Sequence, residues 1–489
     1  MTPQSLNTHG LALARQSRFA EAAAAFRQAI AADPAYAEAH YNLAKSLKDL
    51  RQPDQAIAAY RRTLVLRPDF APAWQNLANL LNETGQTQLA IEAYQRVLTL
   101  EPQNPGAHGM LARIFHQSNC LEQSLPHFQA LANLLPSQAE PLHALGVALH
   151  DLNRLDEAAV AYRRCLAIDP AHAHAAYALG LIHLTQGDFA AGWQLYESRR
   201  RLPAPRAVRD YPQPMWTGSP LQGQTILLHA EQGLGDTLQF IRYAPMVTKM
   251  GAKVILQCPA QLARLLNNHL SITQVVEDGS PLPQFDVHCA LLSLPGIFQT
   301  TFNTIPASVP YITPIPADVA HWKSRLESAS PCLPVSLSPC LQRRAGIVWS
   351  GSSTHRNDRN RSILPQAFEI LTSIPNLTLV SLQKSGSPPT PTLQASLLDF
   401  TADLSDLADT AALIANLDLV VTVDTSIAHL AGAMNKPTWL LLPCAADWRW
   451  LLNRPDSPWY PSMRLFRQPQ PNDWTTPLHQ IINALSNPK

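Results

Sequence analysis

The sequence predicts an α-helical repeat array followed by two α/β domains, and three observations support this fold class. Prolines recur every 34 residues through the first two hundred positions. Beyond residue 206, short apolar runs of strand length alternate with helical patterns. A stretch rich in proline and serine, residues 328–345, divides that region into two halves. With 489 residues, 46% of them hydrophobic and 15% charged, the chain can bury several cores.

Residues 1–206 carry the 34-residue period without insertion or deletion. Each unit has a proline, a small residue twelve positions before it and an aromatic residue eight positions before it. The sets are Pro34, Pro68, Pro102, Pro136 and Pro170; Ala22, Ala56, Ala90, Ser124 and Ala158; and Phe26, Tyr60, Tyr94, Phe128 and Tyr162. Small residues let two antiparallel helices approach, the aromatic ring fills the gap to the next repeat, and the proline ends the second helix. The pattern resembles the tetratricopeptide repeat, with about six units.

Stacked repeats of this type create a concave surface that holds an extended peptide. We expect side chains of the first helices to line this surface: His40, Trp74, Asn76, Asn79 and His108. Packing within the array is the alternative for each of them. The array therefore predicts a protein or peptide partner.

The remaining sequence predicts two βα domains, at residues 207–327 and 346–489, joined by the linker at 328–345. In the first, the strand "TILLHA" precedes a helix expected from Asp236 to Met250. Alternating strands and helices indicate parallel sheets. Two such domains leave a cleft between the carboxyl ends of their strands, where these sheets bind ligands.

Composition excludes several classes of protein. A net charge of +1 argues against nucleic-acid or membrane-surface binding through bulk charge. The apolar runs fall far short of the ~20 residues that a membrane-spanning helix needs. The seven cysteines form no C-x-x-C pair, which argues against a cysteine-ligated zinc site or a disulfide framework and favours a reducing compartment. The first ten residues lack the features of a signal peptide, so we expect a cytoplasmic protein.

In the second domain, the stretch "LVVTVDTSIAHLAG" predicts an anion site. A buried strand ends at Asp424, and a helix begins with Thr425 and Ser426. Free backbone N–H groups, hydroxyls and the positive end of the helix dipole would hold a diphosphate there. Asp424 would then bond a ribose or cap the helix. The alternative is that Asp424 or Thr425 caps a purely structural helix.

Two other strand ends of the same domain carry groups that suit a phosphate. The loop after its first strand begins with Ser350 and Gly351 and contains four possible cations: His355, Arg356, Arg359 and Arg361. Arginine matches phosphate oxygens bidentately, although a solvated loop is the alternative. Gln383 and Lys384 end the next strand. Together these groups predict a nucleotide diphosphate site.

In the first domain, the turn "EQGLGDT" offers a lone carboxylate. Gly233 and Gly235 would let a substrate approach the backbone, and Asp236 would face the cleft, where it can accept a proton from an attacking hydroxyl. Helix capping is the alternative for Asp236. The turn does not meet the Gly-x-Gly-x-x-Gly fingerprint, which disfavours a nicotinamide oxidoreductase. The reaction that fits is sugar transfer from a nucleotide sugar, and the absence of an Asp-x-Asp motif argues against a metal or other cofactor.

Longer stretches of the sequence resemble a known family. "LHAEQGLGDTLQFIRYAP", "VWSGSSTHRNDRNRSI", "SLQK" and "VDTSIAHLAGAMNKPTWLLLP" are similar to bacterial tetratricopeptide-repeat proteins with a glycosyltransferase domain. That domain is similar to the heptosyltransferase-like family nine and, more distantly, to O-GlcNAc-transferase-type enzymes. The resemblance implies a GT-B fold of two Rossmann-like βα domains and an inverting, metal-independent transferase.

The resemblance also implies roles for single residues. Asp236 corresponds to the proposed base of heptosyltransferases. Their Asp-Thr-Gly motif with a nearby histidine contacts the donor phosphates, and it corresponds to Asp424, Thr425 and His429. Ser426 replaces the glycine of that motif.

A family cation after the first strand of the second domain corresponds loosely to Arg356 or Arg359, because the loop lengths differ. The segment Trp448–Trp450 looks typical of the family without a predicted role. By analogy with proteins that glycosylate other proteins, the acceptor is expected to be a protein. The alternative is a repeat adaptor whose transferase-like domain no longer catalyses.

Overall fold

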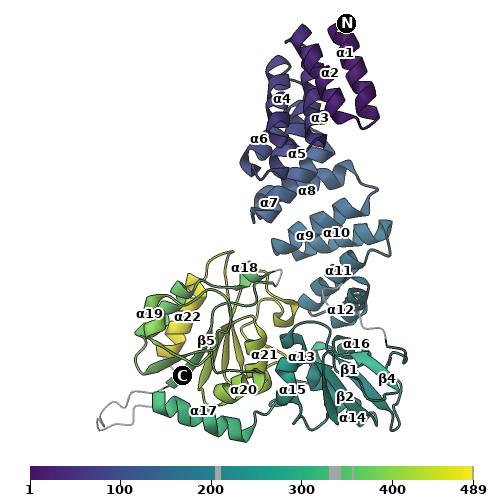
Figure 1. Cartoon of the computed structure of the whole chain (residues 1–489). Helices are drawn as coiled ribbons and strands as arrows, with labels where there is room; N and C mark the ends of the chain where they lie inside the picture. The colour runs from purple at the N-terminus through teal and green to yellow at the C-terminus, as the bar shows by residue number, and fades with distance from the viewer. Residues whose placement is uncertain (204–210, 330–342, 355–356, 487–489) are drawn as a thin grey trace. The chain divides into compact units, whose positions relative to one another are not determined.

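The computed structural model describes residues 1–203, 211–329, 343–354 and 357–486 (Figure 1). Contacts divide the chain into two compact units, Met1–Ala175 and Ala176–Lys489. This division falls inside a helix of the sixth repeat, whereas the sequence pattern places the end of the array at residue 206. The sixth helical pair groups with the sheets because Trp193 in its second helix donates its indole N–H to the Thr300 carbonyl at 2.8 Å.

The first unit consists of antiparallel helix pairs. Its elements are α1 (Pro3–Arg15), α2 (Phe19–Ala32), α3 (Ala37–Asp49), α4 (Pro53–Leu66), α5 (Ala71–Glu83), α6 (Thr87–Leu100), α7 (Pro105–Gln117), α8 (Leu121–Leu134), α9 (Ala139–Asp151) and α10 (Leu155–Ile168). The first helix of each pair starts 34 residues after the previous one, so the repeat period of the sequence is also the period of the structure.

The core of this unit is built from the repeated small and aromatic positions. Each repeat's small residue and aromatic ring are at most 8% exposed. Two glycines of the first helices let an aromatic ring approach closely: a Cβ atom on Gly10 would lie 2.6 Å from the Phe26 ring, and one on Gly146 would lie 2.5 Å from the Tyr162 ring. The predicted packing role of these positions is confirmed.

The side chains expected on the concave surface all have partners within the array. His40, Trp74 and His108, spaced 34 residues apart, each bond the carbonyl oxygen of their repeat proline, at 3.1, 2.9 and 3.0 Å. The other two bond tyrosine hydroxyls, Asn76 with Tyr41 at 2.8 Å and Asn79 with Tyr94 at 2.7 Å. These bonds fit the packing alternative, and contact with a peptide stays a prediction.

The second unit begins with α11 (Ala173–Thr185, which spans the division), α12 (Phe189–Tyr196) and the 3-10 helix η1 (Glu197–Arg201). A parallel sheet in the order β3-β2-β1-β4 follows. Its strands are β1 (Thr225–His229), β2 (Lys253–Cys258), β3 (Gln274–Glu277) and β4 (Val287–Ala290). The helices around it are α13 (Leu234–Phe240), η2 (Ile241–Tyr243), α14 (Ala244–Lys249), α15 (Ala260–Leu266), η3 (Leu291–Ser293), α16 (Leu294–Ile297), η4 (Phe302–Thr304) and α17 (Pro316–Ala329).

The single helix expected from Asp236 to Met250 is wrong. The structure has α13, a turn of 3-10 helix and α14 in its place. Pro245 explains the break, because proline has no N–H for the helical ladder and is tolerated only in a first turn.

A second parallel sheet has the order β10-β9-β8-β5-β6-β7. Its strands are β5 (Arg343–Val348), β6 (Leu377–Ser381), β7 (Leu397–Asp399), β8 (Leu419–Val423), β9 (Thr438–Leu442) and β10 (Met463–Arg467). Its helices are α18 (Asp358–Arg361), η5 (Pro365–Ser373), α19 (Pro391–Ala395), α20 (Leu407–Ala415), α21 (Ser426–Ala433), η6 (Trp448–Trp450) and α22 (Thr475–Ser486). Most of the linker expected at 328–345 lies outside the described residues.

Both sheets reverse their strand order at one point. In the first sheet β1 lies between β2 and β4, and in the second β5 lies between β6 and β8. Open parallel sheets bind ligands at the carboxyl ends of the strands beside such a reversal. The α plus α/β architecture is therefore confirmed, and the reversal points draw attention to the turns after β1, β5 and β8. None of the described helices has both the length and the apolar character to cross a membrane.

Candidate functional site

The turns after β1 and β8 meet within the second unit. α13 and α21, the helices that follow these strands, pack against each other (Figure 1). Gly235 makes the approach possible, because a Cβ atom there would lie 2.7 Å from Cδ2 of His429 and 3.5 Å from the Ser426 Cα atom. The structure thus brings the predicted acid turn of the first βα half next to the predicted anion site of the second.

Asp236 uses both carboxylate oxygens within this contact. Its Oδ2 atom accepts the Gly233 backbone N–H at 2.8 Å, and its Oδ1 atom accepts a hydrogen bond from the Arg449 guanidinium. The first bond is the helix-capping contact that the sequence left open as an alternative. The Asp236 side chain remains 17% exposed, so it is still accessible from one side.

Arg449 joins the two βα halves. It comes from η6, in the second half, and bonds Asp236 and the Gln239 side-chain oxygen of the first half as well as Asp447 at 2.9 Å. Its guanidinium lies 4.6 Å from the centre of the Trp448 ring. Burial alone would lower the pKa of Arg449, but the carboxylates of Asp447 and Asp236 raise it well above its ordinary value. Arg449 is therefore a fixed buried cation beside the predicted base.

At the start of α21, backbone groups are left without a side-chain cap. Thr425 occupies the N-cap position in an extended conformation, but its side chain caps no N–H. Its hydroxyl instead lies 3.2 Å from the Thr422 hydroxyl. Arg361 donates to the Asp424 carbonyl oxygen at 2.9 Å. Uncapped N–H groups with an arginine beside them are the features of an anion site.

His429 lies in the contact between the two halves. It is 6% exposed, its Nδ1 atom bonds the Tyr460 hydroxyl at 2.9 Å, and its ring stacks on Trp450 with centroids 5.4 Å apart. Burial lowers the pKa of His429 well below its ordinary value, so the ring is neutral near pH 7. This placement fits the packing alternative, and a contact of His429 with donor phosphates stays a prediction.

The loop after β5 is tied down by Gln383. The Gln383 side chain accepts the backbone N–H groups of Trp349 and Ser350, both at 2.9 Å, and donates to the Ser350 carbonyl at 3.0 Å. A Cβ atom on Gly351 would collide with the Arg361 guanidinium. Gln383 and Gly351 therefore position the loop and Arg361.

The other cations that the sequence predicted for this site are Lys384, Arg359, Arg356 and His355. The exposed Lys384 donates its ammonium to the Leu404 carbonyl. Arg359 is exposed on α18, whereas Arg356 and His355 lie outside the described residues. Arg361, in the same loop, donates a hydrogen bond to the Asp424 carbonyl oxygen at the end of β8.

Family comparisons match both parts of the chain. Models of the tetratricopeptide repeat match residues 7–69, 41–108, 76–139 and 139–172. The model of glycosyltransferase family 9 (heptosyltransferase) matches residues 402–441, which contain β8 and α21 but not Asp236. The chain is a tetratricopeptide-repeat protein with a glycosyltransferase-like region.

A curated relative matches more than half of this repeat protein. Protein FlbA of Caulobacter vibrioides is 28% identical over 334 residues, which cover 62% of the chain and 53% of FlbA. The chain thus spans about half the length of this relative. Among solved structures, YrrB, a TPR protein with an unusual peptide-binding site, is 23% identical over 36% of the chain and 91% of YrrB, with a TM-score of 0.33. MamA is 21% identical over 35% of the chain and 93% of MamA, with a TM-score of 0.33.

The sequence alone gave no role to Arg449, which joins the two βα halves. Arg449 lies between Trp448 and Trp450 in a stretch that had no predicted role. An arginine flanked by two large aromatic residues in an apolar context was the available signal, since such a cation is stable only with buried carboxylate partners. Its partner Asp236 is 213 residues away, so spacing alone does not reveal the pair.

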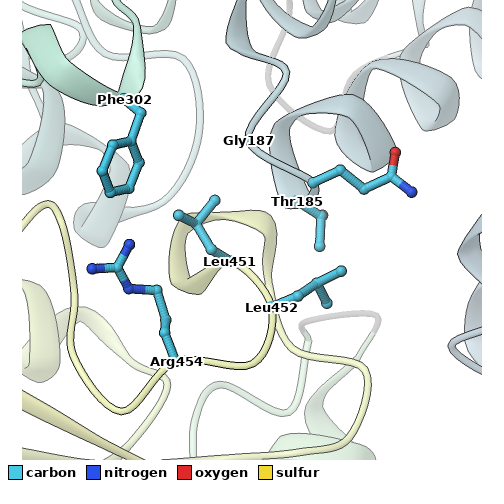
Figure 2. A pocket seen from close by; sticks show the side chains of 7 residues that line it. Thr185, Gly187, Phe302, Leu451, Leu452 and Arg454 are labelled. Carbon is cyan, nitrogen blue, oxygen red and sulfur yellow. The ribbon is translucent and has the colours of Figure 1, made fainter.

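A separate groove lies beside the residues that follow Trp450 (Figure 2). It has a volume of about 490 Å³ and is lined by Thr185, Gln186, Gly187, Phe302, Leu451, Leu452 and Arg454. Arg454 lies over the Phe302 ring, with the guanidinium carbon 5.1 Å from the ring centre. None of the predicted site residues lines this groove.

Asp424 provides a pH-dependent prediction. Burial and the nearby Asp447 raise the pKa of Asp424 to about 6, and Trp450, Arg361 and Arg449 offset part of this effect. Since the folded pKa exceeds the unfolded one, the stabilising contribution of the protonated form is present at low pH and is lost as pH rises through about 6. Asp424→Asn should therefore raise the free energy of unfolding at pH 8 by up to about 3 kcal/mol.

The increase in the free energy of unfolding that Asp424→Asn causes should shrink as pH falls toward 4, where wild-type Asp424 is protonated in the folded state. Urea denaturation followed by tryptophan fluorescence at both pH values measures it. An equal gain at pH 8 and pH 4 would show that the carboxyl charge is not its cause.

Proposed function

We propose that the protein is an inverting, metal-independent glycosyltransferase that moves a sugar from a nucleotide sugar to an acceptor hydroxyl. The hydroxyl oxygen attacks the anomeric carbon, and Asp236 takes the hydroxyl proton. The bond from the anomeric carbon to the diphosphate oxygen breaks, and its electron pair leaves with the nucleoside diphosphate. Direct displacement of this kind inverts the anomeric centre.

The observation that carries the proposal is the contact between α13 and α21 at Gly235. A carboxylate and an uncapped helix start come from two different sheets, and each follows a strand beside the point where the order of its sheet reverses. Such strand ends are the ligand-binding edges of parallel sheets. Two edges that meet with complementary chemistry support a reaction between a donor on one side and an acceptor on the other.

On the donor side, the departing diphosphate would bind the backbone N–H groups at the start of α21. Fixed dipoles and a cation stabilise a developing negative charge without reorganising during the reaction. Arg361 is suited to this role because its guanidinium is already held at the end of β8. The family 9 match covers this segment, which supports the assignment of the donor to the second half.

On the acceptor side, Asp236 keeps the capacity to act as a base. A carboxylate has about four lone-pair positions, and the bonds with Gly233 and Arg449 occupy two of them. The remaining positions can accept the proton of a substrate hydroxyl. Arg449 would hold the carboxylate in one orientation.

One observation favours the adaptor as a second candidate function. Asp236 is paired with a buried arginine across a close helix contact, and such a pair would also suit a rigid, non-catalytic unit. The glycosyltransferase and the adaptor differ in whether a nucleotide-sugar donor is turned over. The full chain incubated with UDP-, GDP-, ADP- and CMP-sugars should release the nucleotide from at least one donor. Partner binding without release from any donor would support the adaptor.

The repeat array would recruit the acceptor protein. Removing residues 1–170 should abolish transfer to a protein acceptor while nucleotide binding survives, because the second compact unit contains both sheets. Nucleotide binding by the truncated chain serves as the control for folding. Unchanged transfer to the full-length acceptor protein would refute recruitment by the array.

A further inference from the structure

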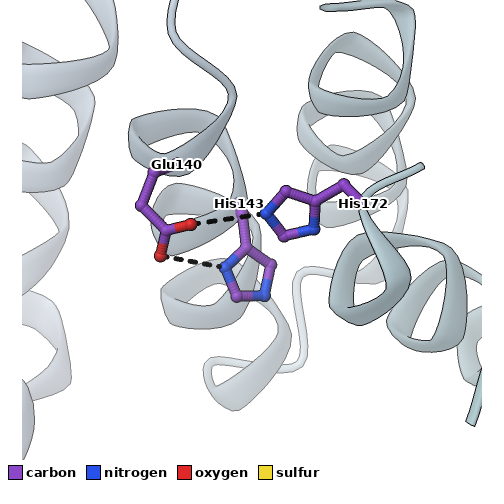
Figure 3. Close-up of side chains that lie close together, drawn as sticks. All are labelled: Glu140, His143 and His172. Atoms are coloured by element: carbon purple, nitrogen blue, oxygen red, sulfur yellow. Dashed lines mark hydrogen bonds and ion pairs between the residues drawn. The ribbon is translucent and has the colours of Figure 1, made fainter. Parts of the chain in front are cut away.

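Three metal-ligating side chains meet between two repeats of the first unit (Figure 3). Glu140 and His143 lie one turn apart in α9, and His172 directly precedes α11. Their ligand atoms all lie within 4.8 Å of one another. Figure 3 shows the Glu140 carboxylate directed at both rings, with one oxygen 3.6 Å from His143 Nδ1 and the other 3.3 Å from His172 Nε2.

The His143 ring has an unsatisfied nitrogen at this place. Its Nδ1 atom is buried and makes no hydrogen bond, although it faces the Glu140 carboxylate. Buried polar atoms in folded proteins are nearly always bonded, so an exception calls for an explanation. A cation held between the nitrogen and the carboxylate would satisfy both groups.

The ligand set defines the class of ion. Two imidazoles with one carboxylate suit Zn²⁺ and related divalent transition metals, whereas Ca²⁺ and Mg²⁺ prefer oxygen ligands alone. A Glu-x-x-His pair presents both side chains on one face of a helix, an arrangement that known helical metal sites use. The ring centre of His174 lies 5.9 Å from that of His143, but His174 is not among the residues whose ligand atoms lie within 4.8 Å of one another.

We propose that Glu140, His143 and His172 bind a divalent transition-metal ion of the Zn²⁺ class and so link α9 to the start of α11. The site lies outside the glycosyltransferase-like region and does not depend on the proposed function. It would hold α9 against the segment that precedes α11, because one ion binds side chains from both.

Binding would also change the start of α11. His172 Nδ1 accepts the Ala175 backbone N–H at 3.1 Å, so the neutral ring carries its proton on Nε2, toward Glu140. Coordination through Nε2 requires this proton to move to Nδ1, which breaks the bond with Ala175. The ion would therefore replace the histidine cap of α11, and part of its binding energy would offset that loss.

The test uses the full chain after treatment with a chelator. Calorimetric titration with Zn²⁺ should give one ion per chain at micromolar concentration, and Zn²⁺ should raise the Tm. Co²⁺ in place of Zn²⁺ should give the visible absorption of a low-coordinate site. His143→Ala and Glu140→Gln should each weaken Zn²⁺ binding by at least about tenfold. Glu140 has a 77% exposed side chain, so the glutamine variant is not expected to disturb folding.

Two control variants locate the site. His40→Ala removes a ring of the same array that bonds the carbonyl oxygen of Pro34, and Zn²⁺ affinity should not change. His127→Ala tests the other close pair, His108 and His127, whose Nδ1 atoms are 3.0 Å apart. The proposal is wrong if Zn²⁺ does not bind, if Glu140→Gln and His143→Ala bind it as wild type does, or if His127→Ala abolishes binding.

Discussion

Asp236→Asn is expected to slow sugar transfer by about two to four orders of magnitude while the affinity for the nucleotide stays within a few-fold of wild type. The amide that replaces the carboxylate has the same size but cannot accept a proton from the attacking hydroxyl. The backbone N–H groups of α21 that would bind the diphosphate are unchanged, so donor binding should persist. Single-turnover rates and calorimetric titration of the nucleotide measure the two effects separately.

Asp447→Asn is the matched control for this variant. Asp447 also bonds Arg449, at 2.9 Å, but it belongs to the half that we assign to the donor and has no proposed role as a base. Its loss should reduce the rate by less than tenfold. If Asp236→Asn transfers sugar at a rate close to wild type, Asp236 is not the base.

Arg449→Met is expected to lower the free energy of unfolding of the second unit by about 3 kcal/mol. Methionine is a long apolar side chain that can still pack against the Phe240 and Trp448 rings. It leaves Asp236 without its cationic partner in the contact between the two halves. The Asp236 and Asp447 side chains are 17% and 37% exposed, which places the cost at the lower end of the range for broken buried pairs.

Tryptophan fluorescence during urea denaturation suits this measurement, because Trp74 is the one tryptophan of the chain that precedes residue 176. Arg454→Met is the matched control. Arg454 pairs with Asp456 at 2.6 Å, but the Asp456 side chain is 61% exposed, so this pair should contribute less than about 1 kcal/mol. Equal losses in the two variants would contradict a special role for Arg449.

The repeat array was predictable because its information is local. The small residue, the aromatic ring and the proline of each unit lie within one stretch of 34 residues, and this period survives in the helix starts. The placement of the candidate site at strand ends was also predictable, since parallel strands share one carboxyl edge. The sequence alone thus indicated Asp236 and Asp424.

Features that depend on packing between distant segments were not predictable. The pairing of Arg449 with Asp236 requires the two βα halves to meet, and the Gln383 clamp on Ser350 joins two neighbouring strand ends. In each case a polar residue was visible in the sequence, but its partner was fixed by tertiary structure.

Amide hydrogen exchange of the full chain with UDP, GDP and ADP tests most directly whether the two turns form one nucleotide-sugar site. At least one nucleotide should slow exchange at residues 424–428, and addition of the sugar-bearing donor should extend the protection to residues 233–237. Exchange that is unchanged in both segments with every nucleotide and donor sugar, or protection confined to other parts of the chain, would show that the two turns do not form one nucleotide-sugar site.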